Sequence, residues 1–241
     1  MPRGGVSTTL DTNGALLNLA HIEGKGARMH PPLIKICGIS TAETLAACLA
    51  AGADWCGFNF YAPSPRFVGS DQVARLAAQV GSAIRKAGVF VDAGDAVLAE
   101  AVAAGRLDAI QLHGHETPQR AAEVRAQFGL PVWKVLSVSE AADVARASAF
   151  YDAADFLLFD ARTPKGQMPG GMGLAFDWSL LAAYRGPLPW GLAGGLTPTN
   201  VAEAARQTKA PLVDVSSGVE SAPGVKDVDK IKAFCQAARA L

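Results

Sequence analysis

The chain has 241 residues, of which 50% are hydrophobic and 18% charged, enough apolar material for a sizeable buried core. Its 22 acidic and 22 basic residues balance, so net charge provides no attraction to nucleic acid or to a membrane surface. No apolar run approaches the roughly 18 residues that a membrane span needs. These features favour a soluble globular protein.

Residues 1–30 lack the apolar stretch of a secretory signal and show no clear periodicity, so we expect a poorly ordered N-terminal extension. Residues 31–241 are then left to form the folded domain. The four cysteines, at positions 37, 48, 56 and 235, show neither CxxC nor zinc-ligand spacing. Free thiols of this kind suit the reducing cytoplasm, where we expect the protein to reside.

Short β-branched runs alternate with alanine-rich amphipathic stretches from residue 33 onward. The predicted strands are 33–37, 54–60, 86–91, 107–113, 131–136, 155–160, 189–194 and 212–217. The predicted helices are 40–52, 70–80, 93–105, 117–129, 139–150, 176–184, 197–208 and 226–241. Several of these helices begin with a Ser, Thr or Asp that can cap the first turn.

Eight strand–helix units in about 210 residues predict an α/β fold, a single (β/α)8 TIM barrel. A doubly wound open sheet is the alternative, but it usually has fewer units and a GxGxxG fingerprint after its first strand. The corresponding segment here reads "CGIS" (37–40), so the barrel is the better interpretation.

The widest spacings follow the second and sixth predicted strands. They contain "YAPSPRFVGS" (61–70) and "ARTPKGQMPGGMGLA" (161–175), the latter with four glycines and two prolines. Both follow strand carboxyl ends, the face on which barrels of this type place their active sites. A long glycine-rich loop there is typical of a lid or a binding loop, with plain surface variation as the alternative.

Lys35 and Cys37 interrupt the apolar pattern of the first strand and share one face of it. If Ile34 and Ile36 on the other face pack against the helices, the lysine and the cysteine point into the barrel. A buried ammonium needs a partner, and the eighth strand, which neighbours the first in a closed barrel, contains Asp214. We expect Lys35 and Asp214 to pair beneath Cys37, lowering the pKa of its thiol so that it can act as a base. The alternative is that Cys37 is merely a small buried hydrophobic residue.

Asp160 ends the apolar run "DFLLFD" just before the glycine-rich loop. An acid at the carboxyl end of a barrel strand is commonly functional, although it could instead cap backbone amides of the loop. A cysteine base on the first strand and a carboxylic acid on the sixth would face each other across the mouth of the barrel. That arrangement suits paired acid–base catalysis.

Candidate anion sites follow the seventh and eighth strands, in "AGGL" (193–196) and "SSGVE" (216–220). Glycines let backbone N–H groups approach a phosphate, and barrels often bind phosphate after these two strands. A plain turn is the alternative for either segment alone. Arg66 in "SPRFV" is another candidate, because its planar fork suits a carboxylate, although a solvated surface arginine is the commoner case.

Gln111 and His113 share one face of the fourth strand, and His115 lies two residues further on. We expect Gln111 and His113 to line the pocket and orient groups in it. No metal site is expected, because no Asp, Glu or Cys cluster with ligand spacing accompanies the histidines.

Taken together, these segments resemble one family closely, the phosphoribosylanthranilate isomerases of tryptophan biosynthesis. The matching segments occur in order along the chain from residue 33: "KICGIS", "GFNFYAPSPRFV", "GVFVD", "IQLHGHE", "FDWSLL", "LAGGLTPTNV" and "VDVSSGVESAPGVKD". "KICG" or "SPR" alone would be weak evidence, but the ordered set is highly specific.

The resemblance implies an Amadori rearrangement of N-(5'-phosphoribosyl)anthranilate to 1-(2-carboxyphenylamino)-1-deoxyribulose 5-phosphate. By the same resemblance, Cys37 is the general base at ribose C2 and Asp160 is the general acid at the ring oxygen. Arg66 would bind the anthranilate carboxylate, and the phosphate would lie against Gly194, Gly195, Ser217 and Gly218. No metal or organic cofactor is implied, because the opened imine is itself the electron sink. The expected partner is this small-molecule substrate alone, for a monomer or a homodimer.

Three alternatives fit less well. The histidine-pathway isomerase would use aspartates on the first and fifth strands, but the first ends in cysteine and "PVWKVL" contains no acid. Indole-glycerol-phosphate synthase would need catalytic lysines and glutamates at strand ends, and Lys134 inside the fifth strand is a poor substitute. A non-catalytic phosphate-binding barrel would be expected to lack Cys37 or Asp160. The chain departs from the family pattern at Met172, in "GGMG" where members often have "GGTG", which leaves the contacts of that loop open.

Overall fold

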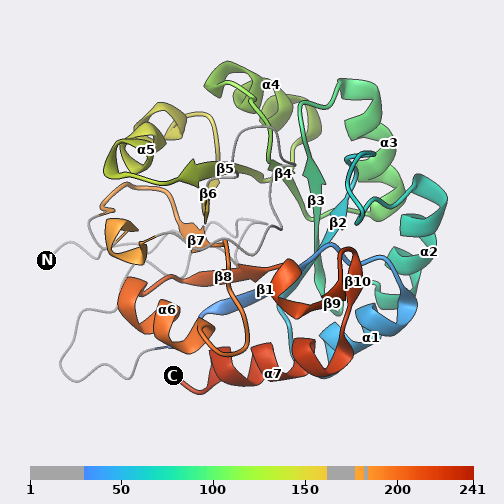
Figure 1. The fold of residues 1–241 in the computed structure, drawn as a ribbon. Helices are drawn as coiled ribbons and strands as arrows, with labels where there is room; N and C mark the ends of the chain where they lie inside the picture. The colour runs from blue at the N-terminus through green and yellow to red at the C-terminus, as the bar shows by residue number, and fades with distance from the viewer. Residues whose placement is uncertain (1–29, 162–176, 182–183) are drawn as a thin grey trace, which may run out of the picture. The chain divides into compact units, whose positions relative to one another are not determined.

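Eight parallel strands close into a barrel, as the sequence predicts (Figure 1). The computed structural model describes residues 30–161, 177–181 and 184–241, and Pro31–Leu241 forms one unit. The strands follow one another in chain order, and β1 pairs with both β2 and β8 to close the ring. Their bounds are β1 Leu33–Cys37, β2 Trp55–Asn59, β3 Arg85–Phe90, β4 Ala109–Leu112, β5 Val132–Val138, β6 Phe156–Ala161, β7 Trp190–Leu192 and β8 Leu212–Val215.

Helices surround the ring of strands (Figure 1). Those in the described residues are α1 Ala42–Ala50, α2 Ser70–Val80, α3 Asp95–Gly105, α4 Pro118–Phe128, α5 Ala141–Ala145, α6 Val201–Thr208 and α7 Val228–Arg239. Thr41 and Thr117 cap α1 and α4 by accepting a hydrogen bond from a first-turn N–H, and Asp227 does the same for α7. The predicted capping by Thr and Asp is therefore present at three of these helices.

Two of the predicted helices differ from the structure. The predicted helix 139–150 becomes the short α5 followed by a 3-10 helix (Arg146–Phe150), where the Ser148 hydroxyl donates to the carbonyl of Ala145. In the described part of 176–184 only a 3-10 turn forms, at Trp178–Leu181. Asp177 accepts a hydrogen bond from the N–H of Ser179 there, so an aspartate turn replaces the first α-helical turn.

Strand alternation divides the core into an outer and an inner layer. Ile34 and Ile36 belong to the large apolar cluster between the strands and the helices, so the lysine and cysteine of β1 face inward as predicted. Inside the barrel a smaller cluster contains Trp55, Trp133 and Phe156, with ring centroids 4.7 and 4.6 Å apart. These residues stand near the starts of their strands, so they fill one end of the barrel and leave the polar residues at the other.

A buried ion pair between β1 and β8 lies in the inner layer. Lys35 and Asp214 are register partners, and Nζ of the lysine is 3.0 and 2.9 Å from the two carboxylate oxygens. Burial is the largest single effect and opposes the charge on Lys35, but the attraction and hydrogen bonds of Asp214, together with the interaction with Cys37, outweigh it, so the pKa of Lys35 is raised. The predicted pair therefore exists, and it joins the two strands that close the barrel.

A short antiparallel hairpin after β8 has no counterpart in the sequence-based prediction. It consists of β9 (Glu220–Ala222) and β10 (Val225–Lys226), with Gly224 at a φ of 82° in the turn between them. A Cβ at Gly224 would clash with the carbonyl oxygen of Pro65. The hairpin therefore packs directly on the loop that follows β2.

Two predictions fall on residues outside the described ranges. The N-terminal extension, 1–30, has only His30 inside them, and most of the glycine-rich loop 161–175 lies outside. Among the described residues, no helix is both long enough and apolar enough to cross a membrane.

Replacing Asp214 with asparagine should destabilise the barrel by about 3–5 kcal/mol, because Lys35 would keep a buried charge without its counter-charge. Urea denaturation followed by circular dichroism measures this loss. The matched control is Glu203→Gln, in the exposed pair with Arg206, which should cost less than about 1 kcal/mol. Equal effects of the two substitutions would contradict the structural role given to the buried pair.

Candidate active site

Cys37 is the last residue of β1, and its thiol points into the mouth of the barrel beside Lys35. Its register partner in β2 is Gly57. A Cβ added at Gly57 would lie 2.9 Å from Sγ of Cys37 and 3.2 Å from Nζ of Lys35. The missing side chain at residue 57 therefore provides the space that the thiol and the ammonium occupy.

The thiol of Cys37 is not acidified, contrary to the sequence-based prediction. Burial raises the pKa of Cys37 above its ordinary value of 9.0, and the lowering effects of Lys35 and Lys226 do not outweigh it. The charge of Lys35 is already paired with Asp214, whose carboxylate itself opposes ionisation of the thiol. The prediction was wrong because the sequence reveals a nearby cation but neither the depth of burial nor the cation's other partner.

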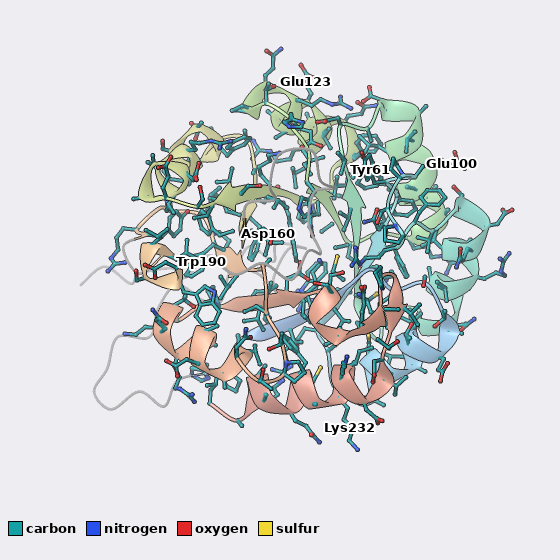
Figure 2. All side chains as sticks on the ribbon, in the orientation of Figure 1. Tyr61, Glu100, Glu123, Asp160, Trp190 and Lys232 are labelled. Atoms are coloured by element: carbon teal, nitrogen blue, oxygen red, sulfur yellow. The ribbon has the colours of Figure 1, made fainter. Side chains whose placement is uncertain are left out.

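Asp160 lies near the carboxyl end of β6, and Figure 2 shows it within the ring of strands. Its Oδ2 is 3.3 Å from Nε2 of His113, the residue that follows β4. Nδ1 of the same imidazole is 3.4 Å from the amide nitrogen of Gln111. Because an amide nitrogen donates, Nδ1 accepts, and Nε2 carries the proton toward Asp160. The imidazole of His113 thus lies beside the carboxyl group of Asp160, within the distance of an ion pair.

The side chain of Gln111 is buried inside the barrel, and its Oε1 has no hydrogen-bond partner among the described residues. A buried acceptor of this kind normally bonds a protein group, water or ligand. Gln111 and His113 are therefore placed where the sequence predicts, facing the same interior as Asp160.

The two parts of the site adjoin each other. Asp214, the partner of Lys35, lies within Coulombic range of both Asp160 and His113. The buried ion pair therefore acts electrostatically on both the thiol of Cys37 and the carboxyl group of Asp160. The structure brings the predicted base and the predicted acid into one mouth.

Arg66 lies in the loop after β2 and is held by a residue that the sequence analysis did not select. Its Nε and Nη2 donate to the two carboxylate oxygens of Glu220, at 2.7 and 2.8 Å. Glu220 also accepts from Nζ of Lys226, at 2.6 Å. The motif "SSGVE" predicts an anion site from its glycine, and nothing in it marks the glutamate as a partner of Arg66. The two residues are 154 positions apart, so no local sequence pattern indicates their contact.

The candidate anion loops after β7 and β8 touch each other. Gly194 and Gly195 have φ values of 85° and 65°, which a side chain would disfavour. Asn200 fixes this loop, since its amide nitrogen donates to the carbonyl of Gly195 at 2.9 Å. Ser217 and Gly218 belong to a 3-10 turn after β8, and a Cβ at Gly218 would clash with the carbonyl oxygen of Leu196. The two loops can adjoin only because residue 218 is a glycine.

His115 does not share the site of His113. Its imidazole is exposed, and Nδ1 is 3.0 Å from Oδ2 of Asp92 on the loop after β3. Among the described residues, no three His, Cys, Asp or Glu side chains gather as a metal site requires. The histidines thus have separate partners.

All of these side chains and loops lie at, or just after, the carboxyl ends of the barrel strands. A closed (β/α)8 barrel that gathers a thiol, a carboxyl group and paired glycine-rich loops at this end has the features of a barrel enzyme capable of acid–base chemistry.

Comparisons with known proteins identify the family within this class. A model of the N-(5'-phosphoribosyl)anthranilate (PRA) isomerase family matches residues 34–237. The N-(5'-phosphoribosyl)anthranilate isomerase of Paramagnetospirillum magneticum is 53% identical over 210 residues, covering 87% of this chain and 98% of the relative. The chain therefore belongs to the phosphoribosylanthranilate isomerase family, and it is an isomerase of tryptophan biosynthesis.

Solved structures agree with this assignment. The phosphoribosylanthranilate isomerase of Thermotoga maritima superposes with a TM-score of 0.78 at 34% identity, covering 87% of this chain and all of that one. A second solved isomerase, in complex with reduced 1-(o-carboxyphenylamino)-1-deoxyribulose 5-phosphate, has a TM-score of 0.76 at 33% identity and covers 87% of this chain and 100% of that one. The barrel and the order of its loops are thus those of the family.

Replacing Gly218 with alanine should push the loops after β7 and β8 apart, because the new methyl group clashes with the carbonyl oxygen of Leu196. We expect the dissociation constant for inorganic phosphate to rise about tenfold, equivalent to ~1.4 kcal/mol, as measured by calorimetric titration. Gly94→Ala is the control, since a Cβ there meets nothing within 4 Å. An unchanged affinity in the Gly218 variant would show that the contact between the loops does not shape an anion site.

Alkylation of Cys37 by iodoacetamide should accelerate about tenfold per pH unit from pH 7 to 9 without levelling off. Only the thiolate reacts, and the pKa of Cys37 lies above the ordinary 9.0, so the reactive fraction keeps rising over this range. Mass spectrometry locates the modification, with the buried Cys48 as internal reference. A plateau below pH 8 would mean that the neighbouring lysines dominate over burial.

Proposed function

We propose that this chain converts N-(5'-phosphoribosyl)anthranilate to 1-(2-carboxyphenylamino)-1-deoxyribulose 5-phosphate, with Cys37 as general base and Asp160 as general acid. The observation that carries the proposal is the position of both groups at the carboxyl ends of their strands, with the Lys35–Asp214 pair in electrostatic range of each. The matched isomerase that binds the reduced form of this product supports the choice of substrate.

In the proposed reaction, Asp160 gives its proton to the furanose ring oxygen, and the C1–O bond breaks to leave a protonated imine. Cys37 then removes the proton from C2, and the electron pair moves through C1 to the imine nitrogen. The resulting enolamine gains a proton at C1 and loses one from the C2 hydroxyl, which gives the aminoketone. The net change moves one hydrogen from C2 to C1 and one proton from the C2 hydroxyl to the former ring oxygen, so the reaction is redox-neutral overall and needs no cofactor.

The high pKa of Cys37 is compatible with its proposed role. A thiolate that forms rarely is also a stronger base once it has formed, and the proton at C2 becomes acidic only after the imine exists. Lys35 and Lys226 favour the thiolate over the thiol, so they limit the cost of ionising a buried sulfur. Burial thus sets the strength of the base, and the two cations keep it accessible.

His113 and Gln111 are proposed to orient the acid and the ribose. Nε2 of His113 lies 3.3 Å from Oδ2 of Asp160, so the other carboxyl oxygen is the one proposed to carry the proton toward the substrate. The unpartnered Oε1 of Gln111 is suited to accept a hydrogen bond from a ribose hydroxyl. These contacts hold the sugar between base and acid, which is how positioning contributes to the rate.

The two ends of the substrate are proposed to bind on opposite sides of this centre. The phosphate lies against Gly194, Gly195, Ser217 and Gly218, and the anthranilate carboxylate lies against Arg66. The positive φ values of the two loop glycines and the close contact of the loops support the first assignment. We further propose that the protein works in the cytoplasm, as a monomer or a homodimer.

Cys37→Ala and Asp160→Asn should each lower kcat by about 10²–10⁴-fold, because each removes one proton-transfer group. The measurement is the loss of anthranilate-adduct fluorescence after the protein is mixed with freshly made N-(5'-phosphoribosyl)anthranilate. Cys48→Ala and Asp108→Asn, which lie outside the mouth, are the matched controls and should retain wild-type turnover.

Binding without turnover by the wild-type protein would replace this proposal with that of a non-catalytic phosphate-ligand barrel. Full activity in only one of the two site variants would leave the reaction in place and reassign that single group.

A further inference from the structure

A buried cluster at the edge of the mouth joins the candidate carboxylate-binding arginine to the strand that bears the candidate base. We define the Glu220 cluster as Glu220, Arg66, Lys226 and Ser216. Glu220 stands at its centre, 8% exposed, and accepts from Nε and Nη2 of Arg66 and from Nζ of Lys226. Two segments therefore meet at one carboxylate, the loop after β2 and the hairpin β9–β10, and Lys226 extends the cluster to Ser216 after β8.

The cluster is connected to Cys37 through the backbone. Nζ of Lys226 donates to the carbonyl oxygen and to Oγ of Ser216, at 2.9 and 3.1 Å. The Ser216 hydroxyl in turn donates to the carbonyl oxygen of Cys37, at 3.1 Å. A displacement of the Glu220 carboxylate would thus shift the guanidinium of Arg66 directly. It would also shift the end of β1, through Lys226 and Ser216.

Close packing restricts the conformation of the Arg66 side chain. Gly38 has a φ of 80°, and a Cβ there would lie 2.7 Å from Cδ of Arg66. The arginine stem therefore crosses directly over the residue after Cys37. Because two parallel hydrogen bonds to Glu220 fix the plane of the guanidinium, they also fix the direction of its other N–H groups.

The charges of the cluster favour an anion nearby. Burial disfavours an ionised Glu220, but the hydrogen bond from Arg66 and the attraction of Lys226 outweigh it, so the pKa of Glu220 is lowered. Within the Glu220 cluster two cations face one carboxylate, so the formal charges of its residues sum to one positive charge. Glu220 reduces that excess, so its contribution through charge alone would be to weaken anion binding.

We propose that Glu220 is a positioning residue that acts through Arg66, holding the guanidinium in the orientation that receives the carboxylate of the substrate. The inference rests on the proposed function, in which Arg66 binds that carboxylate. Orientation and charge make opposite predictions for a neutral substitution. If orientation dominates, Glu220→Gln weakens binding, whereas charge alone would strengthen it, because the excess positive charge rises from one to two.

The test is a double-mutant cycle on N-(5'-phosphoribosyl)anthranilate turnover with wild type, Glu220→Gln, Arg66→Ala and the double variant. We expect Glu220→Gln to raise KM by about 10–100-fold with a change in kcat of less than about threefold, a coupling typical of close charge pairs. In the Arg66→Ala background the same substitution should change KM by less than about twofold, because the guanidinium that Glu220 orients is already absent.

Glu220→Asp provides a second variant that keeps the charge. The shorter side chain retains a carboxylate for Lys226 but cannot keep both bonds to Arg66, so KM should lie between wild type and Glu220→Gln. Thermal denaturation of every variant separates loss of binding from loss of folding. If Glu220→Gln does not fold, the Asp variant alone and in the Arg66→Ala background completes the cycle.

Three outcomes would overturn the inference: a lower KM in Glu220→Gln, an equal rise in KM with and without Arg66, or a loss of stability at unchanged KM. Wild-type protein without turnover would instead overturn the proposed function. In that case the cycle is run on the dissociation constant for reduced 1-(o-carboxyphenylamino)-1-deoxyribulose 5-phosphate, read by its fluorescence. A wild-type protein that also fails to bind this compound would overturn both.

Discussion

The ion pair between Lys35 and Asp214 is the interaction on which the rest of the site depends. It joins β1 to β8, where the ring of strands closes, and it places a charge pair inside a barrel whose lower interior is filled by aromatic and aliphatic side chains. A pair in this position is costly to form and very costly to break on one side only. What it provides is a fixed polar layer from which the thiol on one side and the carboxyl group on the other can project.

Most of the fold could be predicted from the sequence because a parallel barrel repeats a local pattern. The strands are short, bounded and mostly apolar on their outer faces, as at Ile34 and Ile36, so all eight appear near their predicted positions. The exceptions arise where side chains compete with the backbone. Asp177 and Ser148 each form a local hydrogen bond that ends or prevents α-helical geometry, and alanine content alone does not reveal it.

Contacts within the site could be predicted only where they join strands that are neighbours in a closed barrel. The partner of Lys35 follows from knowing that the first and last strands touch, so that contact was accessible from the sequence. The partner of Arg66 was not, because Glu220 comes from a hairpin that departs from the repeating pattern. The pKa of Cys37 was predicted in the wrong direction, since it depends on a balance of burial against charge that only a three-dimensional arrangement determines.

Gly57 on β2 lies opposite Cys37 on β1, so the side chain that position 37 can accommodate depends on residues of both strands. Sγ of Cys37 occupies the volume next to which a Cβ at residue 57 would lie, so the side chains at the two positions compete for the same space. Evolutionary or laboratory diversification of this barrel is therefore constrained jointly at residues 37 and 57. With glycine at residue 57, the group at residue 37 already has all the space that this pair of positions offers. Any larger residue at position 57 is compatible only with a smaller group, or a shifted strand, at position 37.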